Sequence, residues 1–373
     1  MSYTYKLIEG TYVVWFAPAN RFMQLQEPAF RLLQDWTNKL PESQIIKKCA
    51  DEYKLQLSEA RRFLMEVTVQ LQSLTKSYIQ NKIVSHCYES KPLEIEWFTT
   101  KIYCINGINF LFRFGDPDLE ALINPGFGYL EKKLIESKVN HRFDLYYCGG
   151  LAILQIDRQT TWKCPYSSLE YFVGLVYMQM INRIHHLTDA NWMGAVHASA
   201  VSSGKGAVLF AAPSGCGKST FTALLMNHGY RVLSDDFSPI SLIDAKVYSF
   251  PKGISVKNGS LKVLQSNLLS LNKKENALPH HTREIFIPII TGEMLAPVPV
   301  NAIVFLQYNP SVEVELKRIS NLNSLSRFLQ QLWLLPTRKA ASGFMEWYFT
   351  LPCYTLRYSN SGKAIGCISG LFK

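Results

Sequence analysis

Hydrophobic and polar positions divide the chain into three blocks, of which the first covers residues 1–88. Tyr12–Phe16 has the composition of a short β-strand, and Arg21–Leu25 alternates like its partner. Apolar residues then recur at the spacing of one helix face in three successive stretches. The three helices are predicted over Pro28–Trp36, from Pro41 and Glu42 to Tyr53, and from an N-cap at Ser58 to Leu74. A hairpin followed by three helices is the outline of a small winged helix-turn-helix domain.

The second block, residues 89–195, mixes short strands with helices. Strands are predicted over Leu93–Thr99, Lys101–Ile105, Ile108–Arg113, Phe143–Cys148 and Leu151–Ile156. Helices are predicted over Asp118–Ile123 and over the apolar stretch Ser167–Ile184. No group of reactive side chains stands out in this block, so we interpret it as a mixed α/β structural domain.

The third block, residues 196–373, alternates buried strands with helices. Ala207–Ala211 is a continuous apolar strand, and a glycine-rich loop follows it. Phe221–His228 is a predicted helix that Gly229 ends as a C-cap, and Arg231–Ser234 is the next predicted strand. Together the blocks predict an α/β chain, α+β overall, with a winged helix first, a mixed α/β domain second and a P-loop domain last.

Composition narrows the picture only in part. The chain has 373 residues, a net charge of +10 and eight cysteines. Positive charge favours acidic or phosphate-rich partners, although an ordinary basic enzyme surface explains it equally well. The cysteines form no C-x-x-C pair, which argues against a zinc site or a disulfide framework. No signal peptide or membrane-spanning run is visible, so we expect a cytoplasmic protein without a membrane partner.

The glycine-rich loop carries the clearest chemistry. Residues 212–219 match the Walker A pattern G-x-x-x-x-G-K-[ST], except that Ala212 replaces the first glycine. Backbone N–H groups of such a loop and the positive end of the following helix suit phosphate oxygens. Lys218 adds a charge at the β- and γ-phosphates, and Ser219 offers a hydroxyl to Mg²⁺. We therefore predict a site for ATP and Mg²⁺. The predicted nucleotide-binding residues are Ser214, Gly215, Cys216, Gly217, Lys218, Ser219 and Thr220.

Two acidic residues, Asp235 and Asp236, come directly after the strand that follows the P-loop helix. In a doubly wound sheet the carboxyl ends of neighbouring strands face one crevice, so the P-loop and the aspartates are expected to meet. One carboxylate can hold Mg²⁺ while the other accepts the proton of a phosphate acceptor. A helix-capping or solvated pair is the structural alternative. His197, which precedes the P-loop strand, would by itself be interpreted as structural.

These motifs resemble the HPr kinase/phosphorylase superfamily, whose P-loop fold is related to that of PEP carboxykinase. The resemblance rests on His197 in the His-Ala-Ser-Ala-Val stretch, on the P-loop and on Gly229–Asp236, and it covers about residues 90–373. The run Pro251–Asn258 is similar to a Pro-x-x-Ile-Ser-x-Lys-Asn run of HPr-kinase-related bacterial proteins found beside peptide-modification genes.

The resemblance implies catalytic roles for His197, Lys218 and Asp235. His197 would lie near the transferred phosphate and the base. Asp235 would be the base, and Ser219 and Asp236 would be the metal ligands, although the order of the two aspartates stays open.

Two cations, Lys257 and Arg283, are candidates to neutralise phosphate or to position substrate, and a solvated surface charge is the alternative for each. The adjacent His280-His281 pair has no carboxylate or cysteine at ligand spacing and is interpreted as polar loop. The downstream glutamate that HPr kinases use as a metal ligand cannot be placed in this chain, because none of its candidates sits in that signature. The candidates are Glu275, Glu284 and Glu293. HPr itself is therefore in doubt as the substrate.

The first block resembles the PqqD-like leader-recognition domains (RiPP recognition elements) of peptide-modifying enzymes. The match rests on Arg21-Phe22 before Leu25 and on the two helices that follow. Such domains bind a leader peptide as an added strand at the hairpin edge. A pure scaffold and a DNA-binding winged helix are the alternatives. Residues 1–90 hold 11 Lys or Arg and 9 Asp or Glu, which gives no concentrated basic face for nucleic acid.

The combined expectation is an ATP- and Mg²⁺-dependent kinase. It would transfer the γ-phosphate to a Ser or Thr hydroxyl of a ribosomally synthesised precursor peptide, held by the first block, or of a small protein. The alternatives are a nucleotide-gated peptide-binding protein without phosphoryl transfer, an HPr-type carbon-regulation kinase/phosphorylase, and a DNA-binding regulator. Because HPr kinases are commonly hexamers, the resemblance also leaves a homo-oligomer open.

Overall fold

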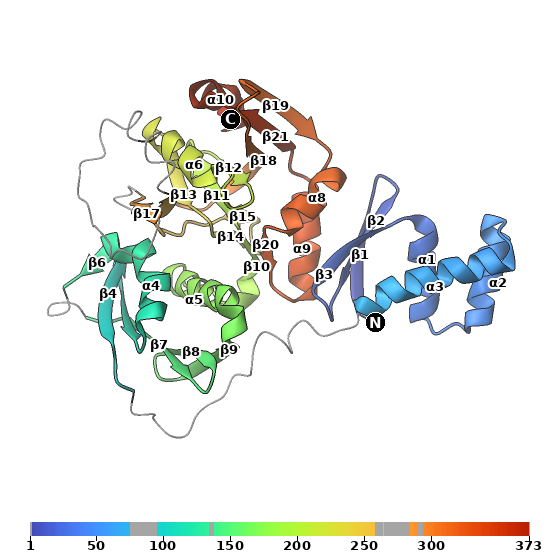
Figure 1. Cartoon of the computed structure of the whole chain (residues 1–373), viewed down its shortest axis with the longest axis horizontal. Coiled ribbons are helices and arrows are strands. Elements are labelled where there is room, and N and C mark those ends of the chain that lie inside the picture. The colour runs from blue at the N-terminus through green and yellow to red at the C-terminus, as the bar shows by residue number, and fades with distance from the viewer. Residues whose placement is uncertain are drawn as a thin grey trace. The chain divides into compact units, whose positions relative to one another are not determined.

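The computed structural model describes residues 2–74, 95–133, 138–257, 264, 284–289 and 294–372. The chain forms two compact units (Figure 1). One combines Met1–Lys82 with Leu334–Glu346, and the other combines Ile83–Trp333 with Trp347–Lys373. The predicted second and third blocks therefore share one unit, apart from the segment Leu334–Glu346. Both units contain helices and strands, which confirms the mixed α/β class.

The first unit is built on a three-stranded antiparallel sheet in the order β1-β2-β3. The strands are β1 (Tyr3–Ile8), β2 (Thr11–Phe16) and β3 (Arg21–Leu25). The predicted hairpin of the last two strands is confirmed, with Trp15 opposite Phe22. Strand β1 was not predicted, because none of its side chains is buried and its apolar alternation is therefore weak.

Three helices follow this sheet, as the apolar periodicity predicts. They are α1 (Glu27–Thr37), α2 (Glu42–Tyr53) and α3 (Leu57–Ser73). Phe30 and Leu33 of α1 share a core with Val14 and Phe16 of the sheet. The predicted N-cap of the third helix is wrong: Ser58 lies inside α3, and Gln56 is the N-cap. Gln56 forms a capping box with Glu59, whose carboxylate accepts the Gln56 N–H at 2.9 Å.

A segment from the far end of the chain completes the first unit. The helix α9 (Arg338–Tyr348) begins in it, and the rings of Phe344 and Phe22 lie 5.2 Å apart. Arg338 Nη2 donates to the Tyr3 carbonyl oxygen at 2.8 Å, and Asn20 Nδ2 donates to the Leu334 carbonyl oxygen at 3.0 Å. The three-stranded sheet is therefore packed against residues more than 300 positions away in sequence.

The second unit contains a sheet in the order β6-β4-β5-β7-β8-β9. Its strands are β4 (Thr99–Ile105), β5 (Ile108–Phe114), β6 (Glu131–Lys132), β7 (His141–Cys148), β8 (Leu151–Ile156) and β9 (Thr160–Pro165). Strands β4, β5, β7 and β8 match predictions, whereas β6 and β9 were not predicted. The predicted strand Leu93–Thr99 is wrong, because its described residues 95–98 form no strand and only Thr99 begins β4.

Two helices accompany this sheet, α4 (Pro117–Phe127) and α5 (Leu169–Ile184). Helix α4 begins where its sequence favours a start. Asp116 is the N-cap and accepts the Asp118 N–H at 2.8 Å, while Pro117 occupies the first turn, where its missing N–H has no consequence. Short 3₁₀ turns follow α4 at Gly128–Leu130 and precede α5 at Tyr166–Ser168.

The largest sheet of the second unit has the order β13-β11-β12-β18-β15-β14-β10, with β21 beside β18 and β19 beside β21. Its strands are β10 (Trp192–Val196), β11 (Ala198–Ser202), β12 (Ala207–Ala211), β13 (Arg231–Ser234), β14 (Ser238–Ser241), β15 (Lys246–Val247), β18 (Val298–Tyr308), β19 (Val314–Ile319) and β21 (Cys353–Tyr358). β20 (Leu332–Leu334) lies beside β10 in the same sheet, and the two remaining strands, β16 (Ile254–Lys257) and β17 (Glu284–Ile287), pair with each other.

Strand directions in this sheet correct the expected doubly wound arrangement. β12 runs parallel to β18 and β18 runs parallel to β21, but β11 lies antiparallel between β12 and β13. The P-loop strand β12 and the strand before Asp235, β13, were expected to be neighbours, and this expectation is wrong because β11 separates them. Both strands nevertheless run in the same direction.

Helices α6 (Lys218–Asn227) and α10 (Ser361–Ile368) cover one face of the sheet. Alternate residues of β12, Val208 and Phe210, are fully buried in a cluster with Phe221 of α6 and Ile365 of α10. Burial of this kind is the main stabilising term in such a sheet. Helix α8 (Asn321–Leu329) does not contribute to that hydrophobic cluster. Among the described residues, no helix is both long and apolar enough to cross a membrane.

Candidate functional site

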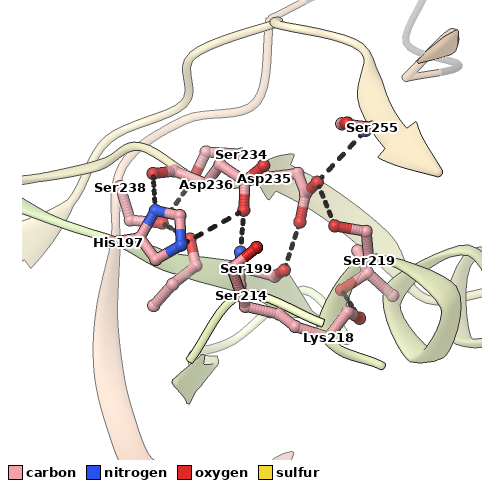
Figure 2. Close-up of polar contacts among 12 residues, drawn as sticks. His197, Ser199, Ser214, Lys218, Ser219, Ser234, Asp235, Asp236, Ser238 and Ser255 are labelled. Carbon is pink, nitrogen blue, oxygen red and sulfur yellow. Dashed lines mark hydrogen bonds and ion pairs between the residues drawn. The ribbon is translucent and has the colours of Figure 1, made fainter. Parts of the chain in front are cut away.

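Strand directions bring three segments to one edge of the largest sheet. β12 ends at Ala211, directly before the P-loop, and β13 ends at Ser234, directly before Asp235. β11 runs the other way between them and begins just after His197, with Ala198 opposite Ala211. The start of an antiparallel strand lies at the same edge as the ends of its two neighbours. His197, the P-loop and both aspartates therefore converge, as Figure 2 shows.

The P-loop has the backbone that phosphate binding requires. Gly215 and Gly217 both have φ of +86°, in the left-handed region that glycine adopts without strain. Gly217 is the N-cap of α6 and makes no side-chain hydrogen bond, so the first helical N–H groups are left to an anion. Ala212 is buried and is not among the residues with positive φ, so alanine fits in place of the first Walker glycine.

Asp235 is fully buried and joins three elements. Its Oδ2 accepts a hydrogen bond from Ser219 Oγ of α6 at 2.9 Å and one from the Ser255 N–H of β16 at 3.4 Å. Its Oδ1 accepts a short hydrogen bond from Ser199 Oγ of β11. Both carboxylate oxygens are therefore occupied, and one of them faces the hydroxyl that would bind Mg²⁺.

Asp236 has a different environment, although it is the next residue. Its φ of +64° is left-handed, a conformation that Asp tolerates better than most side chains, and its side chain is 21% exposed. Its Oδ1 forms a close ion pair with Lys218 Nζ, and Lys252 Nζ lies 3.8 Å from its Oδ2. His197 Nε2 lies 3.9 Å from Oδ1. Asp236 is therefore a cleft carboxylate that three basic groups surround.

His197 is held as a neutral base. Its Nδ1 lies 3.2 Å from the Asp236 carbonyl oxygen, and because a carbonyl only accepts, Nδ1 carries the proton and Nε2 keeps a lone pair. Partial burial, followed by the ammonium groups of Lys218 and Lys252, lowers the pKa of His197 to about 4, against an opposing effect of Asp235. At neutral pH the imidazole is therefore uncharged.

Lys218 is 5% exposed, and burial lowers the pKa of its ammonium. Apart from the ion pair with Asp236, its Nζ has no hydrogen-bond partner among the described residues. A buried ammonium with spare donors favours an anionic ligand, because unsatisfied buried charge is costly. A phosphate at the P-loop would supply the missing acceptors.

Apart from the buried Asp235, these residues line a cleft of about 490 Å³, which lies within the range of small-molecule sites. The P-loop, His197 and Asp236 supply polar groups to its lining. Leu122 and Pro125 of helix α4 and Phe286 of β17 add apolar side chains to the lining. The cleft thus combines phosphate-binding groups with an apolar wall.

The structure brings most of the predicted site residues to this cleft. Lys257 also lines it, and its Nζ donates to Ser214 Oγ at 3.3 Å. Cys216 is partly buried against the core below the loop instead. Arg283 lies outside the described residues, as do the His280-His281 pair and the side chains of the candidate glutamates Glu275, Glu284 and Glu293.

Among the polar side chains of the site, Ser199 and Lys252 were not predicted. Ser199 holds Asp235, and Lys252 enters the cleft from the segment between β15 and β16. A lone serine in a buried strand gives no signal in a single sequence. Lys252 stands in the Pro251–Asn258 run, which marked the segment but not the residue.

No group of three or more His, Cys, Asp or Glu side chains in the described part of the chain could hold a metal ion. Mg²⁺ at a nucleotide needs no such cage, because it binds one or two protein oxygens together with phosphate oxygens and water. Ser219 Oγ and the carboxylate of Asp235 that faces it fit this donor set.

No protein-family model matches this chain, and no curated protein matches it. A functional assignment therefore depends on the residues of the cleft.

Proposed function

We propose that this protein is an ATP- and Mg²⁺-dependent kinase with an HPr-kinase-like P-loop domain. It transfers the γ-phosphate to a Ser or Thr hydroxyl of a peptide or small protein. The observation that carries the proposal is the pair of adjacent aspartates beside the P-loop, one bonded to Ser219 and the other facing the cleft between Lys218 and His197. Nucleotide binding alone requires no second carboxylate in the cleft.

Phosphate binding is assigned to the P-loop. The backbone N–H groups of residues 214–220 surround the β- and γ-phosphates, and Lys218 exchanges its ion pair with Asp236 for phosphate oxygens. Ser219 and Asp235 would hold Mg²⁺, which would neutralise part of the phosphate charge.

The environments of the two aspartates favour Asp236 as the base, the reverse of the order that the resemblance implied. A base must reach the acceptor hydroxyl, and Asp235 is fully buried with both oxygens occupied. Asp236 lines the cleft and is partly exposed. Asp235 is the better candidate for the metal ligand, because it is hydrogen-bonded to Ser219, the other proposed ligand.

The proposed step is a single in-line displacement. The acceptor oxygen bonds to the γ-phosphorus, the bond from that phosphorus to the β–γ bridging oxygen breaks, and ADP leaves with that electron pair. The acceptor proton passes to Asp236. Neutral His197 donates to the Asp236 backbone from Nδ1 and thereby fixes the loop that carries this base.

The first unit is assigned to substrate recognition. Its small sheet and three helices suit a PqqD-like domain, and a peptide could extend the sheet at an edge. The proposed substrate is therefore a ribosomally synthesised precursor peptide whose leader binds this unit, in the cytoplasm. A nucleotide-gated peptide-binding protein is the second candidate, because it would use the same cleft without transfer.

Mass spectrometry of a candidate precursor peptide, after incubation with ATP and Mg²⁺, separates the two candidates. A mass increase of one phosphate on Ser or Thr, lost with EDTA, is the expected result. Unmodified peptide that nevertheless binds tightly when ATP is present would support the binding protein instead. Asp236→Asn, which removes the proposed base, should lose this added mass, and Asp118→Asn, which neutralises an exposed aspartate in the same unit, is its control.

A further inference from the structure

A second lysine, Lys252, lines the cleft together with the P-loop lysine Lys218. Its side chain is only 12% exposed, and its Nζ lies 3.8 Å from Asp236 Oδ2. At that distance the two groups form an ion pair but no hydrogen bond. The same Nζ lies 5.9 Å from the centre of the Tyr177 ring and 5.7 Å from that of Phe286. The ammonium is thus largely removed from water with only weak compensation, which favours an anionic ligand.

Helix α4 and the turn after it hold the backbone around this lysine. The Gly253 N–H donates to the Gly126 carbonyl oxygen at 2.8 Å, and Tyr129 Oη donates to the Pro251 carbonyl oxygen at 2.7 Å. The Lys252 stem also packs on Gly126, where an added Cβ would lie 2.9 Å from Lys252 Cγ. A lysine stem is usually flexible, and this packing restricts it to one direction.

The two lysines bind the same anionic group, the carboxylate of Asp236, and could therefore bind the same phosphate. Lys218 Nζ and Lys252 Nζ both lie within ion-pair distance of that carboxylate, one at each oxygen. A phosphate group close to that position could therefore contact both ammonium groups. Two cations on one phosphate suit the most highly charged phosphate of a nucleotide, the terminal one.

We propose that Lys252 binds the γ-phosphate of the nucleotide together with Lys218, and that Gly126 is a positioning residue for Lys252. The inference deepens the proposed function, on which it rests for the identity of the ligand. Lys252 would act as a cation supplied within the chain, comparable to an arginine finger in cis. The middle α/β region is then part of the catalytic site and not only a scaffold.

Binding of ATP and of ADP, each with Mg²⁺, tests the first part by calorimetry on the full chain. Lys252→Met keeps the apolar stem and removes the charge. Loss of a charged contact corresponds to about 10- to 100-fold weaker ATP binding, with ADP binding changed by less than about threefold. Lys246→Ala, which removes a surface lysine of the same unit, is the control and should change neither. Equal effects of Lys252→Met on both nucleotides, or no effect, would overturn the proposal.

Two neighbouring glycines test the positioning role. An alanine Cβ at Gly126 would meet Lys252, whereas at Gly128 the nearest atom is Asn124 Oδ1 at 3.9 Å, and neither glycine has a positive φ. Gly126→Ala should weaken ATP binding relative to ADP, and Gly128→Ala should not. In the Lys252→Met background, Gly126→Ala should cause no further loss of this preference, since its effect acts through the ammonium. A full additional loss there would show that Gly126 acts independently of Lys252.

The outcomes also separate this inference from the proposed kinase activity. Phosphate transfer by the wild type, with an unchanged ATP-over-ADP preference in Lys252→Met, would remove the role of Lys252 and leave the kinase. A Lys252-dependent preference for ATP without transfer to any peptide would remove the kinase and leave the γ-phosphate contact. A wild-type protein that binds neither nucleotide would overturn both.

Discussion

Two adjacent aspartates with different surroundings dominate the site at the scale of single residues. Asp235 belongs to the buried hydrogen-bond network of Ser199 and Ser219, and Asp236 belongs to the cleft. The left-handed backbone at Asp236 turns its side chain away from that of its neighbour. One chain segment thereby presents two carboxylates in different roles.

Asparagine substitutions at both positions should separate these roles. Asparagine keeps the shape of the side chain and tolerates the left-handed backbone at residue 236. Asp236→Asn should lower kcat by about 10²- to 10⁴-fold, the usual range for a lost general base, while ATP still binds. Asp235→Asn should instead raise the Mg²⁺ concentration needed for ATP binding. Labelled-ATP transfer and metal titrations measure both effects, and the opposite pattern would restore the order implied by the resemblance.

The low pKa of His197 predicts a pH effect on stability. The folded pKa of about 4 lies below the ordinary value of 6.5, so the unfolded chain binds more protons between these values. His197 therefore lowers stability progressively as the pH falls from 6.5 to 4 and has no such effect above this window. His197→Asn keeps a donor to the Asp236 carbonyl and should lose less stability than the wild type between pH 7 and pH 5. Urea unfolding at each pH measures this, with pH 8 as the baseline; parallel losses would contradict it.

At the scale of elements, the site depends on a strand, a loop and a helix in succession. Local sequence predicted β12, the P-loop and β13 with their bounds, because a buried apolar run and glycines with special φ leave strong local signals. It did not predict that β11 lies between β12 and β13. Which strands become neighbours depends on packing between distant segments, and the local pattern of apolar residues does not predict it. For the same reason Lys252 was missed: its place in the cleft depends on α4, more than a hundred residues earlier.

The P-loop backbone predicts unequal effects of two glycine-to-alanine substitutions. At Gly217, with φ of +86°, alanine should cost about 1–2 kcal/mol of unfolding free energy. Its Cβ would meet Tyr358 Oη only at an ordinary 3.5 Å, so backbone strain is the cause. At Gly366, inside α10 with no atom near the new Cβ, alanine should stabilise by about 0.5–1 kcal/mol. Chemical denaturation of both variants measures the difference; equal effects would contradict a strained P-loop cap.

At the scale of the whole molecule, the chain order and the division into compact units do not coincide. The first unit needs Leu334–Glu346, which the sequence placed with the P-loop domain. The amphipathic pattern of α9 is visible in the sequence, but it does not say which apolar surface the helix covers. The tertiary contacts assign it, among them those of Phe344 with Phe22, of Arg338 with Tyr3 and of Glu346 with Lys6.

Removing the Phe344 side chain should therefore destabilise the N-terminal sheet β1–β3. Phe344 is 1% exposed and packs on Phe22 of β3, so Phe344→Ala should cost about 3–5 kcal/mol, the usual range for a buried phenylalanine. The loss should appear as faster hydrogen exchange in β1–β3, because the helix supports that sheet. Phe344→Leu keeps most of the buried volume and should cost less than about 1.5 kcal/mol. If exchange in β1–β3 stayed at the wild-type rate in Phe344→Ala, the three-stranded sheet would be stable without the helix, and residues 1–82 would form a unit of their own.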